Sequence, residues 1–270
     1  KREYINVLLK TYKASTVALF HRLFKIAINV AVEDEIIPRN RFNRITIEQS
    51  NDKLDNFLTA EELNTLLNVA KKHEDVTNYT LILLLAFTGM RKGEALGLTW
   101  NNINFKDKTI TVERTRDRYG ARTPKTKNSY RTVKVDGILI KQLEQYLTWC
   151  KELKFSYGLK VDSEKDYVFI SHKDGSPVGT DTLYYAFNCL YEKMEQEGIK
   201  IKRITPHGLR HTHATVLINN GIPPKTIADR LGNTVEMIYT VYTHSFEELE
   251  EKAVSVFSEN LLNGAKCGAK

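Results

Sequence analysis

Residues 228–245 read Ala-Asp-Arg-Leu-Gly-Asn-Thr-Val-Glu-Met-Ile-Tyr-Thr-Val-Tyr-Thr-His-Ser. After its Leu-Gly pair comes Asn233, and two tyrosines, Tyr239 and Tyr242, follow Asn233 by six and nine positions. A tyrosine hydroxyl ionises near pH 10, so it must lose its proton as it attacks another group. Whether either tyrosine takes part in such chemistry depends on two segments that come earlier in the chain.

The first of these segments, residues 88–98, reads Thr-Gly-Met-Arg-Lys-Gly-Glu-Ala-Leu-Gly-Leu. A glycine turn follows the apolar stretch that ends here, and Arg91 lies at the predicted start of the next helix. A guanidinium held by rigid elements can bind a phosphate through two parallel hydrogen bonds. The simpler interpretation is a surface ion pair between Arg91 and Glu94.

The second segment, residues 205–215, reads Thr-Pro-His-Gly-Leu-Arg-His-Thr-His-Ala-Thr. His207 and Arg210 are three positions apart, so they share one face of a helix that begins there. That face offers a hydrogen-bond donor for a phosphate and a second guanidinium. Zinc binding by His207 and His211 is the competing idea. No cysteine or carboxylate lies at metal spacing, so packing or hydrogen-bonding roles are favoured for His211 and His213, and no metal site is predicted.

Taken in order, Thr-Gly-Met-Arg91, His207-x-x-Arg210, the Leu-Gly pair and Tyr242-Thr-His resemble the tyrosine recombinase (phage integrase) family. Integrases of prophages and integrative conjugative elements are the most similar. The resemblance implies a mainly α fold with a small antiparallel β-sheet (α+β), preceded by a partial helical core-binding domain. It also implies a site-specific recombinase that cleaves and rejoins DNA through a 3′-phosphotyrosine, thereby integrating or excising a mobile element.

The resemblance also implies a role for each matching residue. Arg91 and Arg210 correspond to the two arginines that bind the scissile phosphate, and His207 to the histidine between them. The family's nucleophile lies nine positions beyond the residue after Leu-Gly, which indicates Tyr242. Tyr239 is then expected to be a helix-packing aromatic residue.

Asn233 departs from the family pattern, which has histidine or sometimes tryptophan at this position. Asparagine is neither a cation nor a proton carrier near neutral pH, although its amide can donate a hydrogen bond to a phosphate. We therefore expect function to be kept with a slower chemical step. His244 is a candidate to compensate for the absence of a histidine at position 233.

A β-hairpin or small sheet is expected where residues 109–115 and 130–135 alternate in polarity around a basic connection. The family uses a lysine on such a hairpin, and Lys125 matches that position best. Lys127 is the second choice and a candidate DNA contact. Without the resemblance, simple solvation of Lys125 would be the preferred interpretation.

These residues suit phosphoryl transfer without a metal or any other cofactor. Two arginines, His207 and Asn233 would stabilise the negative charge that collects on the nonbridging oxygens. Lys125 is the candidate acid for the departing 5′ oxygen, and His207 the candidate base for the tyrosine. A covalent phosphotyrosine conserves the phosphodiester bond, so rejoining needs no ATP.

The chain is expected to form two domains, residues 1–52 and residues 53–270. In the first, an amphipathic helix over residues 15–32 carries His21 and Arg22 on its polar side. The resemblance makes this domain the C-terminal part of a core-binding domain, with earlier residues missing. Lys13, Ser15 and Arg22 are candidate phosphate contacts, and a solvated surface role is the equal alternative for each.

The second domain is expected to open with a capping box at residues 59–62 and to contain a buried segment at residues 79–87. This apolar segment predicts a central helix, although periodicity alone leaves a buried strand open. The resemblance implies that a C-terminal helix over residues 246–261 and its tail dock on a neighbouring subunit, in a ring of four.

Charge and composition agree with a DNA partner. The 270 residues carry a net charge of +7 and a pI near 9.1, which favours polyanions. The first residues, Lys-Arg-Glu-Tyr-Ile-Asn, do not have the apolar core of a signal peptide, and the longest apolar run, residues 81–87, is too short to cross a membrane. The expected setting is the bacterial cytoplasm, at the nucleoid. Expected partners are double-stranded DNA, a homo-tetramer formed on it, and accessory DNA-bending or excision factors.

Two alternatives stay open from the sequence. A type IB topoisomerase or telomere resolvase would use similar residues, although the helical segment before residue 52 favours a recombinase. A DNA-binding module derived from a recombinase, which no longer cleaves DNA, is supported by Asn233 alone.

Overall fold

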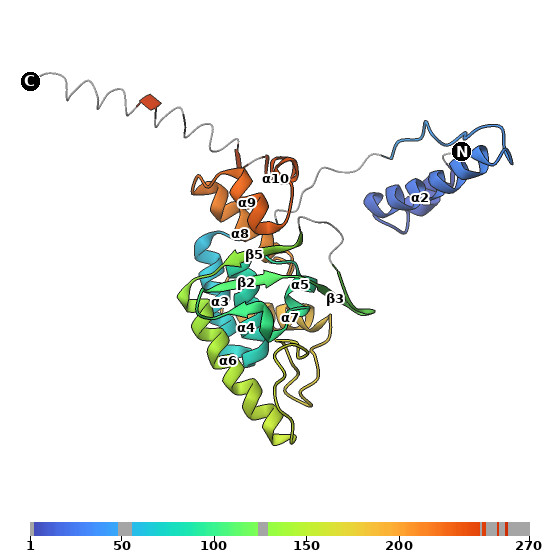
Figure 1. The fold of residues 1–270 in the computed structure, drawn as a ribbon. Coiled ribbons are helices and arrows are strands. Elements are labelled where there is room, and N and C mark those ends of the chain that lie inside the picture. Colours follow the sequence, from blue (N-terminus) through green and yellow to red (C-terminus); the bar gives the residue numbers. More distant parts are fainter. Residues whose placement is uncertain are drawn as a thin grey trace, which may run out of the picture. The chain divides into compact units, whose positions relative to one another are not determined.

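The computed structural model describes residues 3–47, 56–123, 129–243, 245, 246, 253, 257 and 258. The predicted site residues Lys125, Lys127 and His244 lie outside this set. By its internal contacts the chain divides into two compact units, Lys1–Asp55 and Asn56–Lys270 (Figure 1).

The first unit contains α1 (Glu3–Leu9) and α2 (Ala14–Glu33), and α2 confirms the predicted helix. The side expected for His21 is wrong, because His21 is buried with only 6% of its surface exposed. The hydroxyl of Tyr4 on α1 is hydrogen-bonded to Nδ1 of His21. The histidine therefore belongs to the contact between the two helices and is not part of a basic edge.

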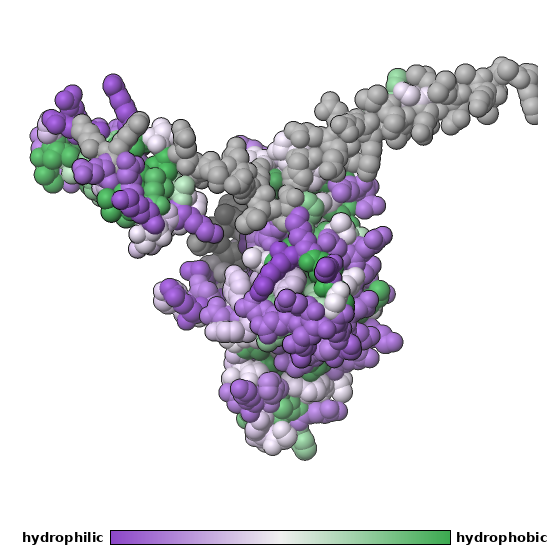
Figure 2. Space-filling model, turned by 180° about the vertical axis from the view of Figure 1, so that it is seen from behind, coloured by the Kyte–Doolittle hydropathy of each residue, from purple (hydrophilic) through white to green (hydrophobic). Residues whose placement is uncertain are grey.

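Much of the apolar face of α2 is exposed. Leu23 is 55% exposed and Phe24 is 41% exposed, and Figure 2 shows hydrophobic residues on the surface of this unit. Helix α2 is long and apolar enough to cross a membrane. One such helix near the start of a chain is weak evidence for a membrane span, because core helices of soluble proteins and signal sequences have the same length and composition. The expected phosphate contacts Lys13, Ser15 and Arg22 are all exposed.

Helix α4 (Val76–Thr88) lies at the centre of the second unit and confirms the predicted buried helix. Leu81, Ile82 and Leu84 on α4 have no exposed surface. Helices surround it on several sides: α3 (Ala60–His73), α6 (Gly137–Ser156), α7 (Thr182–Gln196) and α8 (Gly208–Asn219). A helix buried on nearly all sides needs no polar face, which explains its uniformly apolar sequence.

The capping box at the start of α3 is also confirmed. Thr59 Oγ1 accepts a hydrogen bond from the Glu62 amide at 3.2 Å, and Glu62 Oε2 accepts one from the Thr59 amide at 2.8 Å. These bonds satisfy two amides that a helix start leaves without intrahelical partners.

A three-stranded antiparallel sheet packs beside these helices, in the order β1 (Ile103–Asn104), β2 (Thr109–Val112) and β5 (Arg131–Lys134), with the 3-10 helix Trp100–Asn102 before it. Strand β2 pairs with β5 from Thr109 opposite Lys134 to Val112 opposite Arg131, which confirms the expected hairpin pairing. The first strand was expected to continue to residue 115. Instead, the chain forms a separate hairpin of β3 (Thr115–Asp117) and β4 (Gly120–Arg122).

The unit holds two hydrophobic clusters that share α8. Leu209 belongs to the main cluster around α4, whereas Ala214 and Ile218 belong to a smaller one. The smaller cluster is completed by α9 (Pro224–Leu231), α10 (Val235–Val241) and Tyr242, while the short helix α5 (Lys92–Leu96) follows α4. Helix α8 therefore joins the main core to the segment that carries Tyr242.

Gly89 ends α4 at the point where three helices approach one another. Its φ of +64° lies in the left-handed region, which glycine adopts without steric cost. A Cβ at this position would lie 2.5 Å from Leu231 Cδ2 and 2.9 Å from His213 Cδ2. Both the backbone conformation and the close packing of α4, α8 and α9 therefore require glycine.

We expect Gly89→Ala to destabilise the protein more than Gly221→Ala does. Gly221 also has a positive φ, of +73°, but a Cβ there would meet no atom of the described residues within 4 Å. In both variants alanine must adopt a left-handed backbone conformation, which costs about 1–2 kcal/mol of stability. Gly89→Ala adds an overpacking cost of about 1–3 kcal/mol. Urea unfolding of both variants measures the difference, and equal losses would contradict the packing argument.

Candidate active site

Arg91 lies at the N-terminus of α5, as predicted, and Glu94 holds it from within the helix. Glu94 Oε2 accepts a hydrogen bond from the Arg91 amide at 3.0 Å, and Oε1 accepts one from Arg91 Nη1 at 2.8 Å. The ion pair that was the simpler interpretation of Arg91 is therefore present, but its carboxylate is buried and not at the surface. It leaves 39% of the Arg91 side chain exposed, and Nη2 donates to Asn233 Oδ1 at 2.8 Å. The ion pair thus orients the guanidinium and leaves part of it accessible to a ligand.

Glu94 is almost fully buried and binds a second arginine that was not predicted from the sequence. Arg131 Nη2 donates to Glu94 Oε2 at 2.8 Å, and Arg131 Nε donates to the Arg230 carbonyl at 2.7 Å. Burial alone raises the pKa of Glu94, but the bonds and charges of Arg131 and Arg91 lower it overall. The carboxylate is therefore ionised and fixes two guanidinium groups beside each other.

Arg210 on α8 is only 4% exposed. Its Nη1 donates to the Gly89 carbonyl at 2.8 Å, whereas its Nη2 has no hydrogen-bond partner among the described residues. Burial, and then the charge of Arg91, lower the pKa of Arg210 to about 10, so it stays charged at neutral pH. A buried donor without an acceptor costs about 1–3 kcal/mol. A phosphate oxygen is an acceptor that would remove this cost.

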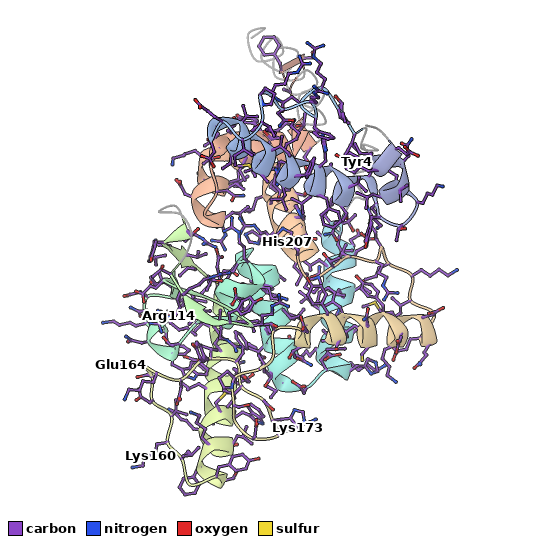
Figure 3. The ribbon with its side chains drawn as sticks, turned by 90° about the vertical axis from the view of Figure 1, so that its right-hand side faces the viewer. Tyr4, Arg114, Lys160, Glu164, Lys173 and His207 are labelled. Atoms are coloured by element: carbon purple, nitrogen blue, oxygen red, sulfur yellow. The ribbon has the colours of Figure 1, made fainter. Side chains whose placement is uncertain are left out.

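His207 lies directly before the first residue of α8 (Figure 3). Burial, followed by the neighbouring His211, Arg210 and Arg91, lowers the pKa of His207 to about 4. Its ring meets the ring of His211 edge to face, with centroids 4.9 Å apart. At neutral pH His207 is therefore uncharged and carries one N–H donor.

Tyr242 follows α10 and is 4% exposed. Its hydroxyl lies 3.1 Å from Nδ1 of His211, so α8 carries the phosphate-binding candidate Arg210 and also contacts the nucleophile candidate. Burial raises the pKa of Tyr242 to about 12, and the positive charge of Arg210 opposes this rise. Tyr239, in contrast, is 50% exposed and packs against Phe246, with the two rings tilted and their centroids 4.9 Å apart.

Asn233 follows Gly232, whose φ of +66° ends α9. Its side-chain oxygen accepts the hydrogen bond from Arg91, so the N–H groups of its amide are the ones available to an incoming acceptor. The residue also borders a pocket lined by Tyr130, Arg131 and Lys225. This arrangement places Asn233 beside the two arginines that Glu94 joins.

His213, the third histidine of α8, has both ring nitrogens in use. Nδ1 donates to the Ala86 carbonyl at 2.9 Å, and Nε2 accepts from Arg230 Nε at 2.9 Å. Arg230 in turn donates to the carbonyls of Phe87 and Lys134. His213 and Arg230 therefore link α8 and α9 to the end of α4 and to β5. With regard to zinc, the described residues include no group of three His, Cys, Asp or Glu side chains that could hold a metal ion.

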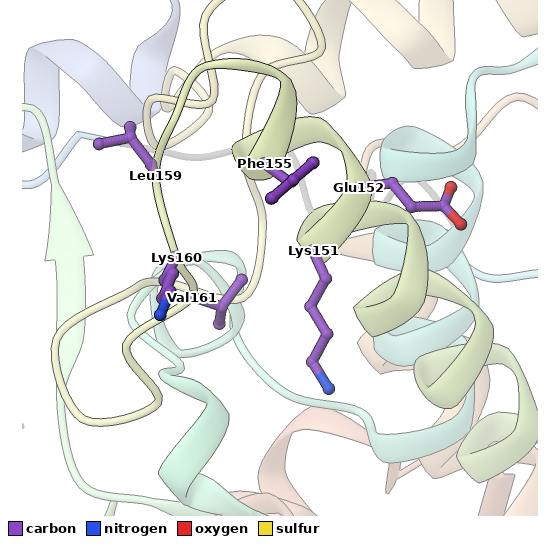
Figure 4. A pocket seen from close by; sticks show the side chains of 6 residues that line it. All are labelled: Lys151, Glu152, Phe155, Leu159, Lys160 and Val161. Atoms are coloured by element: carbon purple, nitrogen blue, oxygen red, sulfur yellow. The ribbon is translucent and has the colours of Figure 1, made fainter.

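A separate pocket lies at the far end of α6 (Figure 4). Its lining residues come from α6 and the loop that follows it: Lys151, Glu152, Phe155, Leu159, Lys160 and Val161. Figure 3 shows Lys160 at the lower end of the second unit, well away from His207. This pocket therefore takes no part in the arginine and tyrosine cluster.

A model of the phage integrase family matches residues 56–248. The chain belongs to the phage integrase family. It is a tyrosine-type site-specific recombinase, as the motif order predicted. Similar proteins include a tyrosine recombinase XerC-like protein of Caldanaerobacter subterraneus subsp. tengcongensis, 29% identical over 96% of this chain and 70% of its own length. The ICEBs1 integrase of Bacillus subtilis is 29% identical over 83% of this chain and 60% of its own length.

Solved structures share the fold of this recombinase. The Tn1549 transposon integrase in complex with transposon right end DNA superposes with a TM-score of 0.76 and 23% identity. The match covers 92% of this chain and 82% of that integrase. The expected fold class, mainly helical with a small antiparallel sheet, is confirmed.

We expect Glu94→Ala to destabilise the recombinase by about 3–5 kcal/mol, because it leaves Arg131 buried without its ion-pair partner. Glu197→Ala is the matched control, since Glu197 also binds two basic groups, Lys72 and His73, but at the surface. Its loss should destabilise the protein far less, because ion pairs at the surface contribute little to stability. Denaturant unfolding measures both, and a similar small loss for the two variants would show that Glu94 is no structural anchor.

Proposed function

We propose that this recombinase cleaves and rejoins DNA by attack of Tyr242 on a phosphodiester that Arg91 and Arg210 bind. One observation carries the proposal. The buried Nη2 of Arg210 has no partner among the described residues, and the charge of Arg210 acts on the hydroxyl of Tyr242. A charged donor without an acceptor, close to a buried tyrosine, fits a site built around a phosphate.

The reaction follows from these groups. As the tyrosine oxygen attacks in line, negative charge collects on the nonbridging oxygens, where the guanidinium groups and the neutral His207 can donate hydrogen bonds. The Tyr242–phosphorus bond replaces the bond to the 5′ oxygen, which leaves as a hydroxyl with a proton that we assign to Lys125. The 3′-phosphotyrosine conserves the bond energy, so a 5′ hydroxyl of another DNA end can reverse the step.

The relatives suggest the biological setting. Besides the ICEBs1 integrase, they include the transposase of transposon Tn916 from Enterococcus faecalis, 27% identical over 87% of this chain and 59% of its own length. These names support the integration or excision of a mobile element as the role of this chain. Cytoplasmic action at the nucleoid follows from a chromosomal substrate.

Double-stranded DNA is the proposed partner, as for the Tn1549 integrase. The net charge of +7 favours it, and Lys13, Ser15 and Arg22 are exposed on the first unit for phosphate contacts. We place the active enzyme in a homo-tetramer on two DNA sites, joined by the C-terminal segment and assisted by DNA-bending or excision factors. Most of that segment lies outside the described residues.

The central test is a covalent adduct. Nicked duplexes from the two ends of the element that carries the gene are incubated with the protein, then separated under denaturing conditions. We expect the wild type to leave a protein–DNA adduct and Tyr242→Phe to leave none, because phenylalanine has no attacking oxygen. Tyr239→Phe, the matched control, should form the adduct at the wild-type rate.

Two results would contradict the proposal. An adduct formed by Tyr242→Phe and lost in Tyr239→Phe would assign the nucleophile to Tyr239. DNA binding by the wild type with no adduct on any duplex would favour the module that binds DNA without cleaving it.

A second test concerns Asn233. We expect Asn233→His to keep or raise the rate of adduct formation, because an imidazole can also donate to the phosphate. Asn233→Asp should lower the rate by about 10-fold or more, since a carboxylate beside Arg91 competes with the phosphate for the guanidinium. Single-turnover cleavage measures both variants. An inactive histidine variant, or an aspartate variant as fast as the wild type, would refute this role.

A further inference from the structure

We propose that His211 holds the hydroxyl of Tyr242 and accepts its proton during strand cleavage. This inference rests on the proposed function and names a residue for one step of it. From the sequence, His207 is the expected base, and only packing or hydrogen bonding is expected of His211. The geometry of α8 points to His211 instead.

The contact between the two side chains has the geometry of a proton transfer. Tyr242 Oη and His211 Nδ1 are 3.1 Å apart, within the 2.6–3.2 Å that a general base requires. The ring centroids are 5.7 Å apart. Because Tyr242 is 4% exposed, bulk water has little access to compete for this proton. Among the described residues, the hydrogen-bond partner of the hydroxyl is His211.

The position of His211 in the sequence couples this contact to the phosphate site. His211 directly follows Arg210, whose side chain is anchored on the Gly89 carbonyl. Both residues lie in the first turns of one helix, so their backbone separation is fixed. A phosphate held by Arg210 therefore lies at a set distance from the hydroxyl that His211 orients.

The charge state of His211 also suits a base. Burial, and then the charge of Arg210, lower its pKa, which favours the neutral imidazole. In the tautomer with hydrogen on Nε2, Nδ1 can accept the hydrogen bond of the Tyr242 hydroxyl. The groups that face this region are His207 before α8, Arg210 on α8, Arg91 before α5, and Tyr242 after α10. A phosphate bound to the arginines would bring a negative charge, which raises the pKa of a neighbouring imidazole. Proton acceptance would thus be favoured when DNA occupies the site.

The O–H bond of Tyr242 breaks as the proton moves to His211 Nδ1, and the oxygen forms its bond to phosphorus. The bond from phosphorus to the 5′ oxygen breaks, and that oxygen takes a proton from Lys125. The imidazolium then carries hydrogen on both nitrogens. When a 5′ hydroxyl attacks in the reverse step, His211 returns the proton to Tyr242. His207 is left to donate to a nonbridging oxygen.

The first experiment compares His211→Ala and His211→Asn with the wild type, on a nicked duplex that the wild type cleaves. Asparagine keeps an amide oxygen that can accept the tyrosine hydrogen bond, but it cannot take the proton. We expect both variants to form the adduct about 100-fold more slowly or worse, with unchanged affinity for the duplex. His73→Asn, a histidine on α3 that pairs with Glu197, is the control and should react at the wild-type rate.

The second experiment replaces the bridging 5′ oxygen at the cleavage site with sulphur, a leaving group that needs no proton. Lys125→Ala should regain its rate on this substrate, whereas His211→Asn should remain slow. An Asn variant as fast as the wild type, or one that sulphur restores, would overturn the assignment. Thermal melting of both variants checks that they fold. If the Ala variant is unfolded, the test rests on the Asn variant. A wild type that cleaves no duplex would refute the proposed function itself, a separate result from either of these.

Discussion

The buried carboxylate of Glu94 is the interaction on which the rest of the site depends. Arg91, Arg131 and Arg210 lie close enough for their charges to act on one another, and Glu94 supplies the negative charge among them. Without it, three guanidinium groups would repel each other in a poorly solvated place. With it, the cluster keeps an excess of positive charge. That excess matches a phosphodiester, which carries one negative charge.

Helix α8 turns this cluster into a site with fixed distances. Arg210 extends to the Gly89 carbonyl, His211 to the tyrosine, and His213 to α4 and α9. Successive residues of a helix point about 100° apart, so neighbours in the sequence can contact different elements. A short motif thereby connects Arg210, Tyr242 and the scaffold, which are the proposed phosphate-binding group, the proposed nucleophile and their support.

Local sequence signals predicted the elements well. The box at residues 59–62, the apolar run of α4 and the glycine before Arg91 each depend on neighbouring residues only, and the structure has all three features. The order of the motifs, rather than composition, identified the family. Contacts between distant residues could not be read in the same way. Arg131 meets Glu94 across 37 positions, and Asn233 meets Arg91 across 142.

The errors have the same physical origin. His21 was placed on a polar face because its neighbours in the sequence are basic, whereas Tyr4, on another helix, decides its burial. The strand expected to reach residue 115 stops at Val112, because its continuation pairs with β4 and not with β5. In both cases a partner outside the local window determines the outcome, and hydrophobic periodicity carries no information about such partners.

The division of the second unit into two clusters has a consequence for the timing of catalysis. Tyr242 belongs to the smaller cluster with α9 and α10, whereas the main core surrounds α4. A smaller cluster buries less apolar surface, so it opens at a lower free energy than the main core. The segment with Tyr242 is therefore expected to open before the scaffold does when the protein is destabilised. In the proposed reaction only molecules with Tyr242 in place can react, so the population of that state would scale the cleavage rate.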